Sequence, residues 1–189
     1  NYIKAINGET EIKCFNDWVK ELKEFNYLHN HTRMLFASIW IFTLRLPWQK
    51  GAEFFMKHLF DGDAASNTLS WRWVAGIQTK GKHYLAQSWN ISKFTNNKYK
   101  NIKLNESSGP IIDKREYQIS SIQIKKNNDQ NEYLIVFENE LHISSFDLKR
   151  YKKIYFFLMD NKDRLIKLDL KVLDFKKKII ASQLKNFGF

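Results

Sequence analysis

At 189 residues, the sequence has room for one medium domain, or for one domain with a smaller companion. Its apolar content of 43% supports a buried core, and its single cysteine excludes an internal disulfide and any metal site built from several cysteines. The net charge of +11, spread over both halves of the chain, favours a polyanionic partner such as nucleic acid, although lysine-rich sequences also occur without one.

The start of the chain and its apolar runs bear on where the protein resides. The first residue is Asn1 rather than Met and no signal segment follows, so we expect an excerpt of a longer protein. The longest apolar run, residues 34–44, is well short of the roughly 18 to 20 residues that a membrane span needs. Cys14 fits both a reducing compartment and a small buried apolar residue. We therefore expect a cytoplasmic monomer without a membrane partner.

Two helices are predicted at the start of the chain. Residues 16–25 have an Asn cap and an apolar face at helical spacing. That face consists of Trp18, Val19, Leu22 and Phe25. Residues 28–46 indicate a second, mostly buried helix, which ends before Pro47 because proline cannot continue a helix.

Two further helices follow. Residues 51–59 indicate a third helix, with Phe54, Phe55 and His58 on one side. The fourth begins near Asp61, with acidic residues in its first turn, where the helix dipole favours negative charge.

The pattern changes in the second half of the chain, which contains none of the six tryptophans. Residues 93–114 are rich in turn formers and indicate a connector. Residues 133–137 and 154–158 are short β-branched and aromatic runs, typical of buried strands. Residues 172–187 predict a closing amphipathic helix. Its inward side chains would be Leu173, Ile180, Leu184 and Phe187.

These elements predict a mainly α region over residues 1–105, followed by a connector and a smaller α/β or α+β segment over residues 106–189. The sequence contains neither internal repeats nor a glycine-rich phosphate loop.

The stretch "FDGDAASNTLSWRWVAG" combines two carboxylates, an amide and two tryptophans. Asp61 and Asp63 could be a metal pair, a clamp on the edge of a flavin, or a solvated helix start. Their spacing lacks a third ligand, so we expect no metal. Trp71 and Trp73 diverge by about 200° on a helix, so they cannot both face one core. One of them is expected at a surface or in a separate role.

Polar residues also open the buried second helix. Asn30 and Arg33 are three residues apart and project from one face. A buried Arg33 would need an acidic partner, with Asp61 or Asp63 as candidates, whereas an exposed Arg33 would need none. His29 and His31 cannot chelate a metal from one helical face and are interpreted as surface or core histidines.

Four motifs resemble the flavin-binding helical core of the DNA photolyase and cryptochrome family. They are "HNHTRM" followed by "AS", "WQKGAEF", "DGDAASN" and "WRWVAG", and they occur in the order and spacing of the family. The resemblance extends over about residues 7–97, and residues from about 115 onward carry no motif of the family. It implies a mainly α, photolyase-type FAD-binding domain with FAD as cofactor.

The resemblance assigns the flavin contacts. Asn30 and Arg33 match positions that line the flavin cavity, and Arg33 would pair with Asp61. Asp61 and Asp63 match the acids at the polar edge of the isoalloxazine ring and its ribityl chain. Asn67 matches the residue that faces flavin N5, where a neutral amide serves either protonation state.

The resemblance also assigns the aromatic residues. Trp71 matches the innermost and Trp48 the middle tryptophan of an electron-transfer chain, whose outermost member would precede Asn1, as would the segment that holds the FAD phosphates. Trp73 matches a wall of the pocket for a flipped pyrimidine dimer. Asn30 and Met34 match other residues beside the lesion, and Lys93 resembles a residue that contacts DNA.

The function that the resemblance implies is light-driven splitting of pyrimidine dimers in UV-damaged DNA by an electron from reduced FAD. Two alternatives remain open at this point. One is a cryptochrome-like blue-light photoreceptor that repairs nothing, and the other is a flavin-free remnant whose helices serve as a scaffold.

Overall fold

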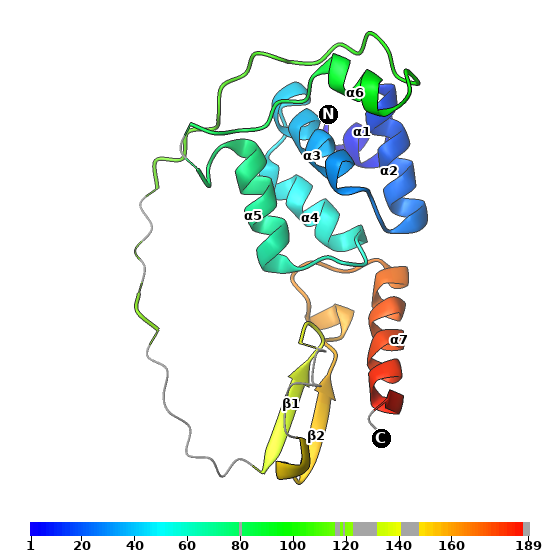
Figure 1. Cartoon of the computed structure of the whole chain (residues 1–189), viewed down its shortest axis with the longest axis vertical. Helices are drawn as coiled ribbons and strands as arrows, with labels where there is room; N and C mark the ends of the chain where they lie inside the picture. Colours follow the sequence, from blue (N-terminus) through cyan, green and yellow to red (C-terminus); the bar gives the residue numbers. More distant parts are fainter. Residues whose placement is uncertain (80, 116–117, 119, 123–131, 141–147, 187–189) are drawn as a thin grey trace. The chain divides into compact units, whose positions relative to one another are not determined.

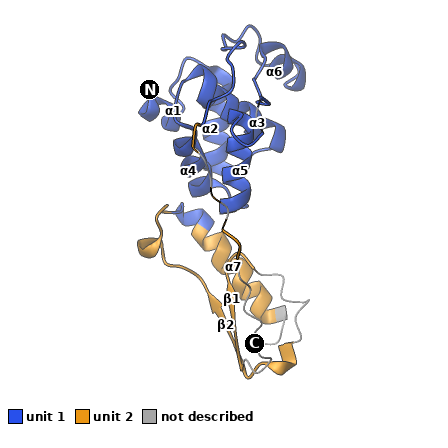
Figure 2. Cartoon of the chain, turned by 90° about the vertical axis from the view of Figure 1, so that its left-hand side faces the viewer, with its two compact units in different colours: residues 1–113, 168–172 blue, residues 114–167, 173–189 orange. Residues whose placement is uncertain are grey.

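The computed structural model of the chain describes residues 1–79, 81–115, 118, 120–122, 132–140 and 148–186. The chain forms two compact units (Figure 2). The helical unit comprises residues 1–113 and 168–172, and the sheet unit comprises residues 114–167 and 173–189. In the described part of the chain, no helix combines the length and the apolar character that a membrane crossing requires.

The regular secondary structure of the helical unit is helical throughout the described residues (Figure 1). In chain order they are α1 (Tyr2–Asn7), α2 (Lys13–Phe25), α3 (Asn30–Ser38), the π-helical turn η1 (Ile39–Thr43), α4 (Trp48–His58), α5 (Ala64–Ala75) and α6 (Ser88–Phe94). The α4 and α5 helices pack against each other, and α3 contacts α5. This helical packing confirms the mainly α class.

The first predicted helix, α2, begins three residues earlier than expected. Asn16 is not its cap, because the side chain of Asn16 accepts hydrogen bonds from the backbone and hydroxyl groups of Thr10 and donates one back to its carbonyl oxygen. Trp18, Val19 and Leu22 are buried as predicted, but Phe25 is exposed. The helix ends there because Asn26 takes the left-handed conformation and turns the chain.

The second predicted helix is interrupted rather than continuous. The α3 helix ends at Ser38, and the chain continues as the π-helical turn η1 before it reaches Pro47. The sequence does not indicate this change from α-helix to π-helix. Every residue from Leu35 to Phe42 is buried, so the run has no polar face whose spacing could reveal the change.

The starts of α4 and α5 also differ from expectation. The α4 helix begins at Trp48, directly after Pro47, which sets a backbone angle suited to a helix start. Asp63 caps α5 by accepting a hydrogen bond from Ser66 N at 2.8 Å. Asp61 lies in the preceding turn, so the two acids do not occupy the first turn of the helix.

Stacked aromatic rings fill the core of the helical unit. Phe36 stacks on Phe15 at 4.4 Å between ring centroids, and the rings of Phe36, Phe54 and Trp40 contact one another, with centroids 6.1 to 6.3 Å apart. Cys14 is fully buried at the edge of this core, and burial raises the pKa of its thiol to about 12.

The segment 168–172 returns to the helical unit. Asp169 N donates a hydrogen bond to Lys57 O at 2.9 Å, and the Asp169 carboxylate lies 3.6 Å from Nδ1 of His58. His58 is buried, and burial lowers its pKa to about 4 despite the opposing charge of Asp169.

The sheet unit contains two parallel strands, β1 (Tyr133–Phe137) and β2 (Lys153–Phe157), in which Tyr133 pairs with Lys153 and Phe137 with Phe157. The prediction of strands is confirmed, but the prediction that they are buried is wrong. Burial alternates along each strand, because side chains point to opposite faces in turn. The exposed face carries Tyr133, Ile135, Phe137, Tyr155 and Phe157.

The α7 helix (Leu170–Asn186) begins in the helical unit and continues into the sheet unit. Ile180 is buried and Leu173 and Leu184 are half-buried, whereas Phe187 lies outside the described residues. Short 3₁₀ turns occur at Leu148–Arg150 and Asn161–Asp163.

An ion cluster lies in the interior of the sheet unit. The Glu138 carboxylate accepts two hydrogen bonds from Arg164, one of them at 2.7 Å, and lies 3.6 Å from the Lys176 ammonium. Burial alone would raise the pKa of Glu138, but the hydrogen bonds from Arg164 and the positive charge of Lys176 outweigh it, and the pKa is lowered.

Candidate functional site

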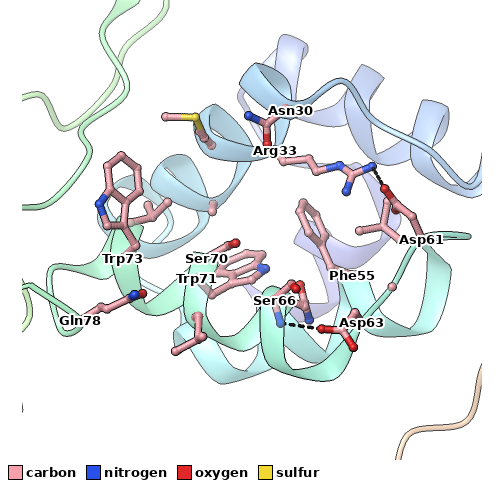
Figure 3. Close-up of a pocket in the computed structure, with 17 residues that line it drawn as sticks. Asn30, Arg33, Phe55, Asp61, Asp63, Ser66, Ser70, Trp71, Trp73 and Gln78 are labelled. Carbon is pink, nitrogen blue, oxygen red and sulfur yellow. Dashed lines mark hydrogen bonds and ion pairs between the residues drawn. The ribbon is translucent and has the colours of Figure 1, made fainter. Parts of the chain in front are cut away.

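A cavity of about 540 Å³ opens between α3, α4 and α5 (Figure 3). This volume is within the range of small-molecule sites, roughly 300 to 1,000 Å³. Its polar lining consists of Asn30, Arg33, Asp61, Asp63, Ser66, Asn67, Ser70 and Gln78. Its apolar lining includes Met34, Ala37, Phe55, Leu59, Leu69, Trp71, Trp73 and Val74. The structure thus brings together eight of the ten candidate residues, with Phe55 as an aromatic neighbour of Trp71.

The spacing along α5 explains why this helix contributes most of the wall. Positions three and four apart lie on one face of a helix. The residues of α5 and its cap that follow this spacing are Asp63, Ser66, Asn67, Ser70, Trp71 and Val74. Sequence reasoning missed Ser66 and Ser70, although the helical spacing from Asp63 would have found both.

Arg33 and Asp61 form the predicted ion pair on one side of the cavity. The Arg33 Nη2 atom lies 3.0 Å from Asp61 Oδ2, and Arg33 Nε also donates to Leu28 O at 2.8 Å. The guanidinium carbon lies 5.2 Å from the ring centroid of Tyr27. These contacts hold Arg33 in one orientation, and the ion pair joins α3 to the turn before α5.

Asn67 is anchored in a way that fixes the direction of its amide. Its Nδ2 donates to the backbone carbonyl of Ala52 in α4 at 2.8 Å. Because a carbonyl oxygen only accepts hydrogen bonds, the nitrogen must be the atom on that side, and Oδ1 points the other way. Asn67 therefore offers the cavity a hydrogen-bond acceptor.

Trp71 forms the floor of the cavity and is only 2% exposed. Its ring packs edge-to-face on Phe55 at 5.1 Å. A Cβ atom at Gly51 would lie 2.2 Å from the Trp71 ring, so only glycine allows α4 to approach this closely. The indole Nε1 is buried and has no hydrogen-bond partner in the described structure.

Trp73 stands on the side of the cavity opposite the ion pair (Figure 3) and is 37% exposed. This confirms that one of the two tryptophans lies at a surface. Trp73 stacks on Tyr84 at 6.1 Å, and the Tyr84 hydroxyl lies 3.3 Å from His31 Nε2. Tyr84 thereby packs against the exposed indole and is itself held by His31, a role that sequence reasoning did not assign.

Two candidate residues, Trp48 and Lys93, do not line the cavity. Trp48 is buried at the start of α4, with the Arg72 guanidinium 5.9 Å from its ring centroid. Lys93 lies in the last turn of α6, with its ammonium 5.7 Å from the ring centroid of Phe94. Their roles remain predictions.

The lining fits the flavin that the resemblance implies. An isoalloxazine ring has apolar faces and an edge of N–H, carbonyl and ring-nitrogen groups, which require apolar walls, donors and acceptors together. The cavity offers the indole N–H of Trp71 and the Arg33 guanidinium as donors, and Asn67 and the carboxylates as acceptors. A buried, unpartnered N–H is costly, so the Trp71 nitrogen points to a bound acceptor. Within the described residues, no group of three or more His, Cys, Asp or Glu side chains could hold a metal ion.

Comparison with known proteins finds photo-lyase and cryptochrome relatives. The deoxyribodipyrimidine photo-lyase of Streptomyces griseus is 44% identical over 73 residues, which is 39% of this chain and 16% of that protein. That of Buchnera aphidicola is 36% identical over 77 residues, or 41% of this chain and 16% of the relative. Cryptochrome DASH of Idiomarina loihiensis is 32% identical over 92 residues, or 49% of this chain and 20% of the relative.

The chain thus matches no more than about a fifth of the length of these relatives. No solved structure matches the chain. The model of the FAD-binding domain of DNA photolyase matches residues 7–114, more than half of the chain and nearly all of the helical unit. The chain therefore belongs to the family of photolyase FAD-binding domains, whose cofactor is FAD.

Proposed function

We propose that this chain is part of a DNA photolyase that splits pyrimidine dimers in UV-damaged DNA. The observation that carries the proposal is the cavity, which gathers the flavin-contact candidates of α3, of α5 and of the turn before α5 around an unpartnered indole N–H. When bound and reduced, FAD would absorb blue light and supply an electron to the dimer. The residues of this chain would bind the cofactor, tune it and present the lesion to it.

The polar residues would hold the flavin edge. Asn30, Arg33, Asp61 and Asp63 come from two segments that the Arg33–Asp61 pair ties together. Because Asp61 offsets the charge of Arg33, the pair can face a neutral ring system without leaving an uncompensated charge. Asn67, with its nitrogen held by Ala52, would accept a hydrogen bond from a protonated flavin N5.

The tryptophans would divide two tasks. Trp71, buried at the cavity floor, would pass electrons toward the flavin, with Trp48 as the next donor outward. Trp73, exposed at the rim and braced by Tyr84, would stack against the flipped bases of the dimer. Asn30 and Met34 line the same cavity, and Lys93 together with the net charge of +11 would attract the DNA backbone.

The test uses the full-length protein loaded with FAD and an oligonucleotide that contains one thymine dimer. We expect blue light to restore the intact thymines. Trp71→Phe should slow photoreduction of oxidised FAD severely, because a phenyl ring is much harder to oxidise than an indole. Repair by chemically reduced enzyme should persist, since electrons then flow from flavin to lesion.

Trp73→Ala should give the opposite result. Photoreduction should persist, while binding of the dimer-containing DNA weakens by about 1 to 3 kcal/mol, the usual contribution of one base–aromatic stack. Equal damage to both assays by both substitutions would instead indicate that the two tryptophans only support packing. Photoreduction without any repair would favour the cryptochrome-like photoreceptor, and a protein that retains no FAD would contradict both functions.

A further inference from the structure

We propose that Trp71 has a second electron supply within this chain, through Trp40 and Tyr2. This route rests on the proposed function, in which Trp71 donates an electron to the flavin cavity. This route would operate beside the one through Trp48. Trp40 and Tyr2 lie outside the four family motifs described above.

Ring contacts connect the three residues in series. The Trp40 and Trp71 rings meet edge-to-face with 6.2 Å between centroids and an interplanar angle of 82°. The Tyr2 and Trp40 rings meet in the same way, at 6.0 Å and 87°. At these distances the ring edges are in van der Waals contact. Electrons therefore need to cross no more than one ring contact at each step from the partly exposed Tyr2 to the cavity floor.

Trp48 is less well connected to Trp71. Among the described residues, Trp48 makes no ring contact with another aromatic side chain, and its ring faces the Arg72 guanidinium at 5.9 Å. An oxidised tryptophan carries a positive charge, which a neighbouring guanidinium opposes. Trp48 is thus harder to oxidise than its burial alone would make it.

The surroundings of Trp40 have the opposite effect. Phe36 and Phe54 both contact the Trp40 ring and lie roughly parallel to it, at interplanar angles of 21° and 19°. The negative faces of aromatic rings attract a cation, so this arrangement favours the oxidised indole. Trp40 Nε1 donates to Pro47 O at 3.0 Å, and a backbone carbonyl is too weak a base to take the proton. The charge therefore leaves Trp40 by electron transfer.

The electrons and protons balance along this route. With oxidised FAD bound and illuminated, Trp71 would give up one electron to the cofactor and regain one from Trp40. Trp40 is then reduced by Tyr2, whose phenol loses an electron to Trp40 and its proton to water. A thiol reductant in solution returns a hydrogen atom to the neutral Tyr2 radical and is itself oxidised.

The test measures radicals as well as photoreduction, with Tyr155→Phe as the control because Tyr155 is exposed and its ring contacts Tyr133 rather than an indole. In the FAD-loaded full-length protein, illumination should give a tyrosyl signal in electron paramagnetic resonance. Tyr2→Phe should abolish this signal, and Tyr155→Phe should leave it unchanged. Trp48→Phe should keep part of the photoreduction, and Trp40→Phe combined with Trp48→Phe should remove it.

A second measurement needs no flavin. Photoionisation of the indoles by ultraviolet light in the apoprotein should yield a tyrosyl radical that Tyr2→Phe and Trp40→Phe both diminish. An unchanged tyrosyl yield in Tyr2→Phe would overturn the route, even where Trp71→Phe abolishes photoreduction as the proposed function requires. Conversely, photoreduction that survives Trp71→Phe would contradict the proposed relay. The tyrosyl yield in the apoprotein would still test electron transfer from Tyr2 to the indoles.

Discussion

The two units of the chain are held together by different means. The helical unit buries a cluster of aromatic rings that contact one another, centred on Phe36 and Trp40. The sheet unit leaves one face of its strands exposed and instead buries the Glu138, Arg164 and Lys176 ion cluster. A packed aromatic core is sensitive to the removal of side-chain volume. A buried ion cluster is sensitive to the removal of one of its charges. The comparison therefore predicts which substitutions each unit can bear.

Removing an aromatic ring should give the largest difference in stability loss between the two units. Phe36→Ala deletes a fully buried side chain and should cost the helical unit about 3 to 5 kcal/mol of unfolding free energy. Phe157→Ala, on the exposed face of β2, should cost no more than about 1 kcal/mol, the value of a cross-strand aromatic pair. Tryptophan fluorescence follows the helical unit alone, since its residues include every tryptophan. Equal losses would show that the two units share one core.

Removing the Glu138 carboxylate should strongly destabilise the sheet unit. Glu138→Ala leaves the largely buried Arg164 and Lys176 charges without the carboxylate that offsets them and should cost about 3 to 5 kcal/mol. Glu132→Ala is the matched control, because its pair with Lys152 is exposed and contributes about 0 to 1 kcal/mol. Hydrogen exchange of the β1 and β2 amides measures both effects. A small loss in Glu138→Ala would mean that the cluster is hydrated.

Acid should destabilise the units in different pH ranges. His58 in the folded chain has a pKa of about 4 against an ordinary 6.5, so the unfolded chain binds the proton more readily. The helical unit is then most stable above pH 6.5 and loses up to about 3 kcal/mol as the pH falls toward 4, at 1.36 kcal/mol per pKa unit. His58→Leu should flatten this dependence, whereas His29→Asn, at an exposed position, should preserve it.

The sheet unit should respond only at lower pH. The pKa of Glu138 is lowered from 4.5 in the folded state, so its stabilisation is present above pH 4.5 and is lost as the pH falls through the lowered value. A helical unit that melted no earlier than the sheet unit on acidification would contradict this order.

A smaller effect is expected from one methyl group below the cavity. Gly51→Ala places a Cβ against the Trp71 ring and should cost about 1 to 3 kcal/mol through overpacking. It should also shift the fluorescence of Trp71. Gly109→Ala is the control, because nothing lies within 4 Å of the added atom. Unchanged stability in Gly51→Ala would mean that α4 can move away from α5 at little cost.

Periodicity predicted the elements of the helical unit, but not their ends. The start of α5 depends on a side-chain hydrogen bond from Ser66 N to Asp63, and Asn16 lies inside α2 because its side chain is bonded to Thr10; hydrophobic patterns encode neither. The π-helical turn at Ile39–Thr43 left no trace in a run that is buried throughout. The strands of the sheet unit were found by their composition, but aromatic runs do not distinguish a buried face from an exposed one.

The motifs predicted two geometric features of the candidate site, because they matched several residues at once. The Arg33–Asp61 pair and the separation of Trp71 from Trp73 were both foreseen. The contact between Trp40 and Trp71 was not, since 31 positions of sequence separate two residues that only tertiary packing brings together. The bracing of Trp73 by Tyr84 was missed for the same reason.

The buried Cys14 makes the protein convenient for site-directed labelling. It is the single cysteine of the sequence, and its thiol, with a pKa of about 12, stays protonated at neutral pH. Thiolates rather than thiols react with maleimides and methanethiosulfonates, so the native residue would remain unmodified. Cysteines introduced at the exposed Lys20 in α2 and Lys178 in α7 would then be the sole attachment points for spin labels. The distance between the helical and sheet units could be measured in solution without first replacing Cys14.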